Sequence, residues 1–91
     1  MNNAELRDNL INTRIWIGKD NKKLSELLQK RLFKIGFKWN GRSDKVKKIN
    51  SITSFTLHPN NRITWDNIDT YEEFLNNLDS FKEVKVTGAK Y

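Results

Sequence analysis

Apolar residues recur along this chain of 91 residues with two periods, one helical and one extended. Between residues 22 and 35 the period is helical, which predicts an amphipathic helix with one buried stripe. The stripe consists of Leu24, Leu27, Leu28, Leu32 and Ile35. Gln29 falls on the opposite side and is expected to face water. Asp20 or Asn21 is placed to cap the start of this helix, and Gly36 is placed for a left-handed turn at its end.

Runs of β-branched and aromatic residues predict five strands around this helix. They cover residues 13–17, 37–39, 51–57, 62–65 and 81–87. In the first strand Trp16 points to the opposite face from its two isoleucine neighbours. A short helix is expected over residues 70–78, because Thr70 and Glu73 have the spacing of a capping box. Residues 4–10 predict one further helical turn.

The order of the main elements is β-α-β-β-β-α-β, which predicts an α+β fold. We expect a small two-layer single domain over residues 13–91, with a mostly antiparallel sheet, one main helix and one short helix. A polar N-terminal segment, residues 1–12, precedes it. The first strand–helix–strand unit suits two parallel strands joined by a right-handed crossover. Trp16, Trp39 and Phe55 are expected in the core, because so short a chain needs large aromatic side chains to bury enough surface.

Residue types that build catalytic and metal sites are scarce. The sequence has no Cys and one His, so a nucleophilic triad reduces to a serine with His58. This histidine precedes Pro59 in an expected hairpin turn, where an oriented base is not held. The carboxylates between Asp66 and Glu73 match no Ca²⁺-binding loop signature. We therefore expect no enzymatic activity, no metal and no cofactor.

Secretion and membrane insertion are also not expected. The first residues lack the charged and then apolar layout of a signal peptide. The apolar runs are two or three residues long, far below the ~20 residues that span a bilayer. These features predict a cytoplasmic protein.

Charge is distributed unevenly along the chain, whose net charge is +6. Residues 19–48 hold eleven Lys and Arg against three acidic residues, whereas residues 49–83 hold two against six. Such segregation predicts a dipolar surface that attracts anionic partners; the alternative is that net charge only keeps a small domain dispersed. Under the first interpretation a partner binds a basic face made of Lys30, Arg31, Lys34, Lys38, Arg42, Lys45, Lys47 and Lys48.

The start of the main helix offers a second place for an anion. Free backbone N–H groups at a helix start, next to cations, favour negative charge. The cations here are Lys19, Lys22 and Lys23. Gly18 alone lacks the glycine-rich spacing of a phosphate-binding loop, so no nucleotide specificity is predicted at this place.

The stretch LQKRLFKIGFKW and the closing FKEVKV resemble small proteins common in the genomes of tailed bacteriophages. In those proteins a helix ends Q-x-x-L-F-x-x-G-[YF]-x-W, and the chain finishes near F-x-E-[IV]. The matching residues here are Gln29, Leu32, Phe33, Gly36, Phe37, Trp39, Phe81, Glu83 and Val84. The resemblance spans residues 13–87 and carries no catalytic motif. It implies an infected bacterial cell, where small accessory proteins bind and disable a host factor.

These observations lead to one main hypothesis and two alternatives. The main hypothesis is a non-enzymatic phage accessory protein in the bacterial cytoplasm. It binds and inhibits a host protein with an acidic surface, for host takeover or counter-defence. The first alternative is a sequence-nonspecific nucleic-acid-binding protein, with cations on phosphates and aromatic rings on bases. The second is a sponge for an anionic nucleotide, with a pocket lined by Trp and by Lys or Arg. The oligomeric state stays open.

Overall fold

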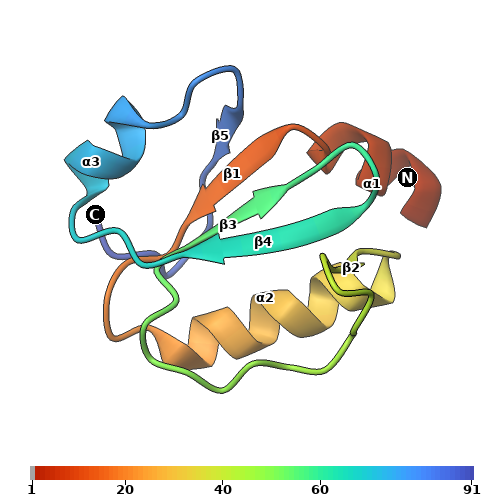
Figure 1. Ribbon diagram of the computed structural model, residues 1–91, viewed down its shortest axis with the longest axis horizontal. Coiled ribbons are helices and arrows are strands. Elements are labelled where there is room, and N and C mark those ends of the chain that lie inside the picture. Colours follow the sequence, from red (N-terminus) through yellow and green to blue (C-terminus); the bar gives the residue numbers. More distant parts are fainter. Residues whose placement is uncertain (1) are drawn as a thin grey trace.

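The computed structural model describes residues 2–91, which form three helices and five strands (Figure 1). In chain order these are α1 (Asn3–Leu10), β1 (Thr13–Trp16), α2 (Lys22–Lys34), β2 (Lys38–Trp39), β3 (Ser54–Leu57), β4 (Arg62–Asp66), α3 (Tyr71–Asn76) and β5 (Lys82–Val84). The predicted α+β class is confirmed, and the elements from residue 13 onward follow the predicted order.

One mixed sheet joins the five strands in the order β2-β4-β3-β1-β5. The central pairs, β4–β3 and β3–β1, are antiparallel. The edge pairs, β2–β4 and β1–β5, are parallel. As a result β1 and β2, which α2 connects, run in the same direction with two other strands between them. Their parallel orientation agrees with the prediction for the first strand–helix–strand unit.

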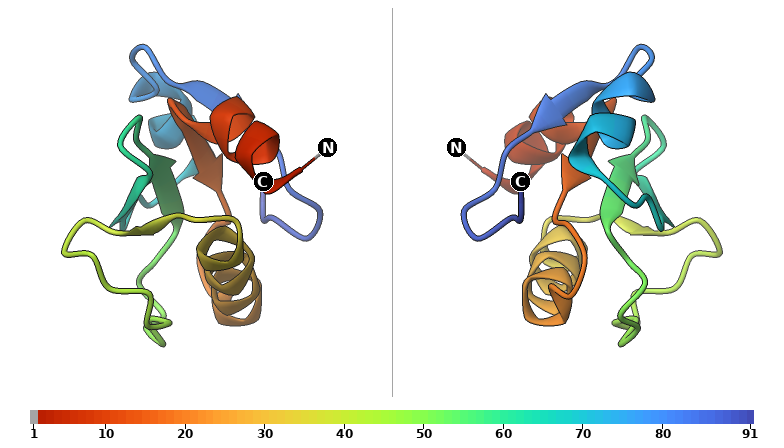
Figure 2. Two further views of the ribbon diagram at one scale, coloured as in Figure 1. Left: turned by 90° about the vertical axis from the view of Figure 1, so that its right-hand side faces the viewer. Right: turned by 90° about the vertical axis from the view of Figure 1, so that its left-hand side faces the viewer.

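α2 lies against one face of the sheet (Figure 1, Figure 2), and the side chains on this face are mainly apolar. Ile15, Phe55 and Trp65 pair across β1, β3 and β4, so their side chains share this face. Trp39 of β2 joins them, and Phe33 of α2 packs against it edge-on with 6.0 Å between ring centroids. Trp39 is 4% exposed and Phe55 is fully buried, which confirms both as core residues.

The opposite face of the sheet is more polar and is partly covered by α3. Trp16 points to this face, as predicted, and is 3% exposed. Its ring packs against Phe74 at 5.4 Å and Tyr71 at 6.1 Å between centroids. Because α3 has only six residues, the fold consists of two full layers, α2 and the sheet, with one short helix on the far face. Both views of Figure 2 show α2 and α3 on opposite sides of the sheet.

The side of α2 that is buried differs in part from the predicted apolar stripe. Four of the five predicted side chains do lie in or against the core, namely Leu24, Leu28, Leu32 and Ile35. Leu27, however, is 45% exposed, and Gln29 is fully buried. The prediction is wrong for these two residues. The segment after β2 runs along α2 and covers Gln29, whose amide binds the backbone of Lys47.

The first turns of α2 and α3 are held by different contacts. Asn21 occupies the N-cap position of α2 but makes no capping hydrogen bond with its side chain. Its amide instead donates to the carbonyl oxygens of Ile17 at 2.8 Å and Gly88 at 2.9 Å. At α3 the predicted cap is confirmed, because Thr70 Oγ1 accepts from the backbone N–H of Glu73 at 3.1 Å.

Residues before β1 form a complete helix where one turn was predicted. The Asn2 side chain caps α1, and Arg7 Nη1 donates to the carbonyl oxygen of Ile35 at 2.9 Å. Gly36 has the left-handed φ of 112° expected at the end of α2. A Cβ atom there would lie 2.5 Å from Arg7 Nη1. The glycine therefore permits both the turn and the close approach of the Arg7 side chain.

Two strands are shorter than the sequence predicts. The alternation over residues 81–87 yields only β5, which has β1 as its single neighbour. Their last register pair is Ile15 with Val84. Residues 51–57 yield only β3, and Thr53 before it bonds Asp66 outside the regular register.

Candidate functional site

The exposed side of α2 is a basic surface with an apolar centre. We define the open face of α2 as Lys23, Leu27, Lys30, Arg31 and Lys34. All five residues are exposed. Lys23, Lys30 and Arg31 are three or four positions from Leu27, and residues at this spacing are neighbours on a helix surface. The open face of α2 is therefore one exposed leucine in a ring of cations.

Helix stability accounts for Arg31 and Lys34, which lie in the last turn, where cations favour the helix dipole. It does not account for Lys23 in the first turn. The ion pairs within residues 2–91 involve Arg14 and Lys19, neither of which lies on the open face. Like charges four residues apart, such as Lys30 and Lys34, destabilise a helix by about 0.2–0.5 kcal/mol. The first turn of α2 contains no acidic residue; it carries Lys22 beside Lys23, where cations oppose the helix dipole.

A second basic surface lies on the segment after β2. Its exposed cations are Arg42, Lys45, Lys47 and Lys48. The segment has no regular structure, but its backbone is anchored. Trp39 Nε1 donates to the Lys45 carbonyl at 2.9 Å, and Gln29 binds the N–H and carbonyl of Lys47 at 2.6 and 3.0 Å. Lys47 Nζ lies 5.1 Å from the Trp39 ring centroid, which is a cation–π contact.

The two basic surfaces lie on different sides of α2. The segment after β2 reaches α2 at Gln29, and Leu27 stands about 200° from Gln29 around the helix axis at about 100° per residue. Lys38 belongs to neither surface. It pairs with Arg62 of β4, and Arg62 shares the α3 side of the sheet with Asp66. Of the predicted basic face, the structure brings together Lys30, Arg31 and Lys34, with Lys23 beside them.

The predicted anion site at the start of α2 is not assembled. Lys19 Nζ lies 2.8 Å from Asp69 Oδ1. This hydrogen bond and the attraction between the charges raise the pKa of Lys19 and lower the pKa of Asp69. Lys22 and Lys23 are exposed on α2. Lys19 thus binds a carboxylate of the α3 connection, and the three lysines do not converge.

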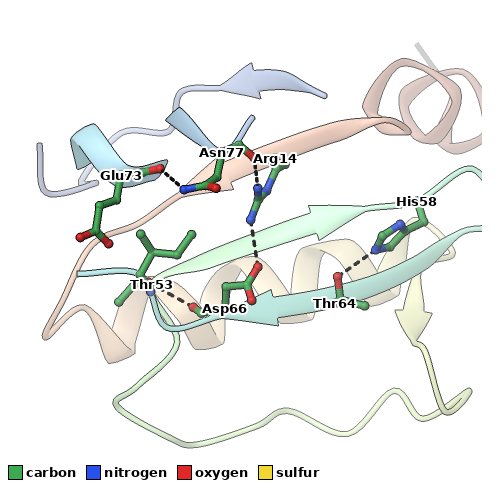
Figure 3. Close-up of polar contacts among 8 residues, drawn as sticks. Arg14, Thr53, His58, Thr64, Asp66, Glu73 and Asn77 are labelled. Carbon is green, nitrogen blue, oxygen red and sulfur yellow. Dashed lines mark hydrogen bonds and ion pairs between the residues drawn. The ribbon is translucent and has the colours of Figure 1, made fainter. Parts of the chain in front are cut away.

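Arg14 is a buried cation on the α3 side of the sheet, and the sequence pattern does not mark it. It is 8% exposed. Its Nη2 lies 2.9 Å from Asp66 Oδ2, and its Nη1 donates to the Asn77 carbonyl (Figure 3). Its guanidinium carbon lies 5.6 Å from the Phe74 ring centroid. These contacts fasten α3 to β1 and β4. In the sequence Arg14 occupies an ordinary polar position of a strand, so its neighbours do not predict that it is buried.

An acidic hollow lies between α3 and β4, with Arg14 in its lining. We define the acidic hollow by its three carboxylates, Asp66, Glu73 and Asp79, which line it together with Asn67 and Asn77. Glu73 and Asp79 are exposed, and neither forms an ion pair within residues 2–91. Residues 63–81 contain no Lys or Arg. The acidic hollow is therefore negative, whereas the open face of α2 is positive.

His58 is the single histidine of the sequence and so the first residue to consider as a catalytic base. It follows β3, and its Nε2 lies 2.8 Å from Thr64 Oγ1 (Figure 3). Its ring meets Phe81 edge-on with 5.9 Å between centroids. Among the described residues no carboxylate orients its other ring nitrogen. These contacts are those of a residue that closes the β3–β4 turn.

Metal and membrane features are equally sparse. The part of the chain that the structure describes brings no three His, Asp or Glu side chains together at metal-binding distance. None of the helices in residues 2–91 has the length and apolar character that crossing a bilayer requires. No protein-family model and no curated protein matches the sequence, and no solved structure matches the fold. The resemblance to phage accessory proteins therefore rests on the quoted residues alone.

Proposed function

We propose that this protein is a binding protein that attaches through the open face of α2 to an acidic surface of another protein. The observation that carries the proposal is the exposure of Leu27, 45%, inside a ring of four cations that form no ion pair within residues 2–91. Protein interfaces commonly place an apolar core inside a polar rim. The cations steer association and select the partner, and Leu27 adds apolar burial.

The exposed leucine favours a protein over a nucleic acid as partner. Burial of apolar surface contributes roughly 25 cal/mol per Å², and the charged phosphates that a basic face contacts offer little apolar surface to meet it. Single-strand binders also need exposed rings for base stacking. Trp16 and Trp39 are 3% and 4% exposed, and Trp65 is half-buried, so none of the three tryptophans is a freely exposed stacking ring. The nucleotide sponge would use a hollow lined by Trp and Lys, such as the one that Trp39, Trp65 and Lys47 line.

The resemblance to accessory proteins of tailed phages supports a bacterial host protein as the partner. In that setting the binding event would disable the host protein, for takeover of the cell or for counter-defence. The mechanism requires no chemical step by this chain. It requires that an acidic functional surface of the host protein be covered by α2.

A capture experiment tests the proposal. The tagged protein is incubated with nuclease-treated bacterial lysate, and captured proteins are identified by mass spectrometry. A captured acidic protein is then purified, and its binding is measured with both components pure. We expect Lys30→Glu combined with Lys34→Glu to weaken binding at least about tenfold, or about 1.4 kcal/mol. We expect Leu27→Ser to accelerate dissociation, because anchor residues act mainly on the dissociation rate.

The matched control reverses the same number of charges on the second basic surface. Lys45→Glu combined with Lys48→Glu should leave binding close to wild type, since these residues lie on the segment after β2. Loss of binding in this control, with binding intact in the α2 variant, would move the site to the segment. Capture of nucleic acid alone, from lysate without nuclease, would replace the protein partner with the first alternative.

A further inference from the structure

The acidic hollow has the chemistry of a seat for a cationic side chain. Asp66, Glu73 and Asp79 line it, and only Asp66 is engaged, by Arg14 at 2.9 Å. The carboxylates share one hollow without being close enough together to hold a metal ion, as judged over residues 2–91. A long lysine or arginine side chain suits such spacing, because its ammonium or guanidinium group can hydrogen-bond oxygens at several points.

The hollow and the open face of α2 lie on opposite sides of the sheet, so they cannot meet within one molecule (Figure 1, Figure 2). α2 presents four cations without an ion pair, and the hollow presents two carboxylates without one. Every copy of the chain carries both surfaces. Complementary potentials on two surfaces favour their encounter and fix how they meet.

We infer that a second copy of this chain places cations of its α2 open face in the acidic hollow, so that molecules associate head to tail. The contact joins two different surfaces, and such an interface repeats from molecule to molecule instead of closing as a symmetric pair. The inference shares the α2 open face with the proposed function. Self-association covers that face, and an acidic partner competes for it.

The association is weak and sensitive to salt. The net charge of +6 makes the molecules repel one another as a whole. The attraction comes from exposed charges, which salt screens with a Debye length of about 30 Å at 0.01 M and about 3 Å at 1 M. Self-association therefore appears at high protein concentration and low salt, and it disappears when salt is added.

Sedimentation of the purified protein alone tests the inference, independently of any partner. We expect the average mass to rise above that of the monomer with concentration at about 0.01 M salt and to return to the monomer at about 1 M. Two variants should each stay monomeric: Lys30→Ala with Lys34→Ala, and Glu73→Ala with Asp79→Ala. A mixture of the two should form dimers and stop there, because only one intact α2 open face then meets one intact hollow.

The control variant removes two exposed lysines elsewhere, Lys82→Ala in β5 with Lys85→Ala directly after it. It should associate at least as well as wild type, because its net positive charge is lower. A wild-type protein that stays monomeric at low salt overturns the inference. So does a mixture of the two alanine variants that stays monomeric. Neither result affects capture of an acidic partner by α2, which the lysate experiment measures separately.

Discussion

The two helices on either side of the sheet carry opposite charges, and they differ in whether the charges of the first turn favour the helix. In α3 the acidic residues Glu72 and Glu73 stand in the first turn, and Thr70 caps it, so the helix dipole and the cap both favour this arrangement. In α2 the first turn holds two lysines and no acid, and Asn21 does not cap it with its side chain. Folding explains the charges of α3. In α2 it explains Arg31 and Lys34 of the last turn. It does not explain the lysines of the first turn, and we assign the open face of α2 to binding.

The largest expected change in stability depends on which side of α2 is buried. Leu32→Ala should lower the free energy of unfolding by about 2–5 kcal/mol, because it opens a cavity in the core. Leu27→Ala should change it by less than about 0.5 kcal/mol, because this side chain is on the open face. Urea unfolding followed by tryptophan fluorescence measures both. Equal losses would mean that α2 buries its predicted stripe, and the open face would then lose its apolar centre.

An intermediate effect is expected on the α3 side, where a buried cation holds the helix. Asp66→Ala should lower the free energy of unfolding by about 1–3 kcal/mol, because Arg14 Nη2 is left without its carboxylate. The exposed pair offers a control, since Asp69→Ala removes the partner of Lys19 at the surface and should change little. Chemical unfolding of both variants gives the comparison. If Asp66→Ala is as mild as Asp69→Ala, the Arg14–Asp66 ion pair contributes no more to stability than the exposed Lys19–Asp69 pair.

The smallest effect sharpens the comparison most directly, because Lys23 and Glu72 occupy the same second position of their helices. Lys23→Glu should raise the free energy of unfolding by about 0.3–1 kcal/mol, as a negative charge favours the helix dipole. It should also weaken partner binding. Glu72→Lys should have the opposite effect on stability. A thermal unfolding series at low salt resolves the signs. Destabilisation by Lys23→Glu would show that the α2 lysines serve the fold after all.

The elements of this fold were predictable where local pattern decides them. The period of five apolar residues predicts α2, and the spacing of Thr70 and Glu73 predicts the start of α3. The rotation of α2 is decided by a contact distant in sequence, between Gln29 and Lys47. A periodic pattern cannot show which side an irregular segment will cover. For that reason Leu27 was assigned to the core and Gln29 to solvent.

The candidate site was predictable in its charge and only partly in its shape. Lys30, Arg31 and Lys34 were identified because folding requires no cations there. Their separation from Lys38 and from the segment after β2 depends on strand register, which pairs Lys38 with Arg62 on the far face. Arg14 was missed because a buried arginine and an exposed one look the same within a strand. Its partners Asp66 and Asn77 lie more than fifty residues away.

The strand order has a consequence for how the chain reaches its fold. β1 lies between β3 and β5, so Thr13 pairs with Leu57 on one side and Lys82 on the other, 44 and 69 residues further along the chain. Pairings this distant cost loop-closure entropy before they return any stability, so they slow folding. On a ribosome, β1 keeps one unpaired edge until residues 82–84 have been made and released from the exit tunnel. During synthesis it is therefore the strand most open to pairing with another chain.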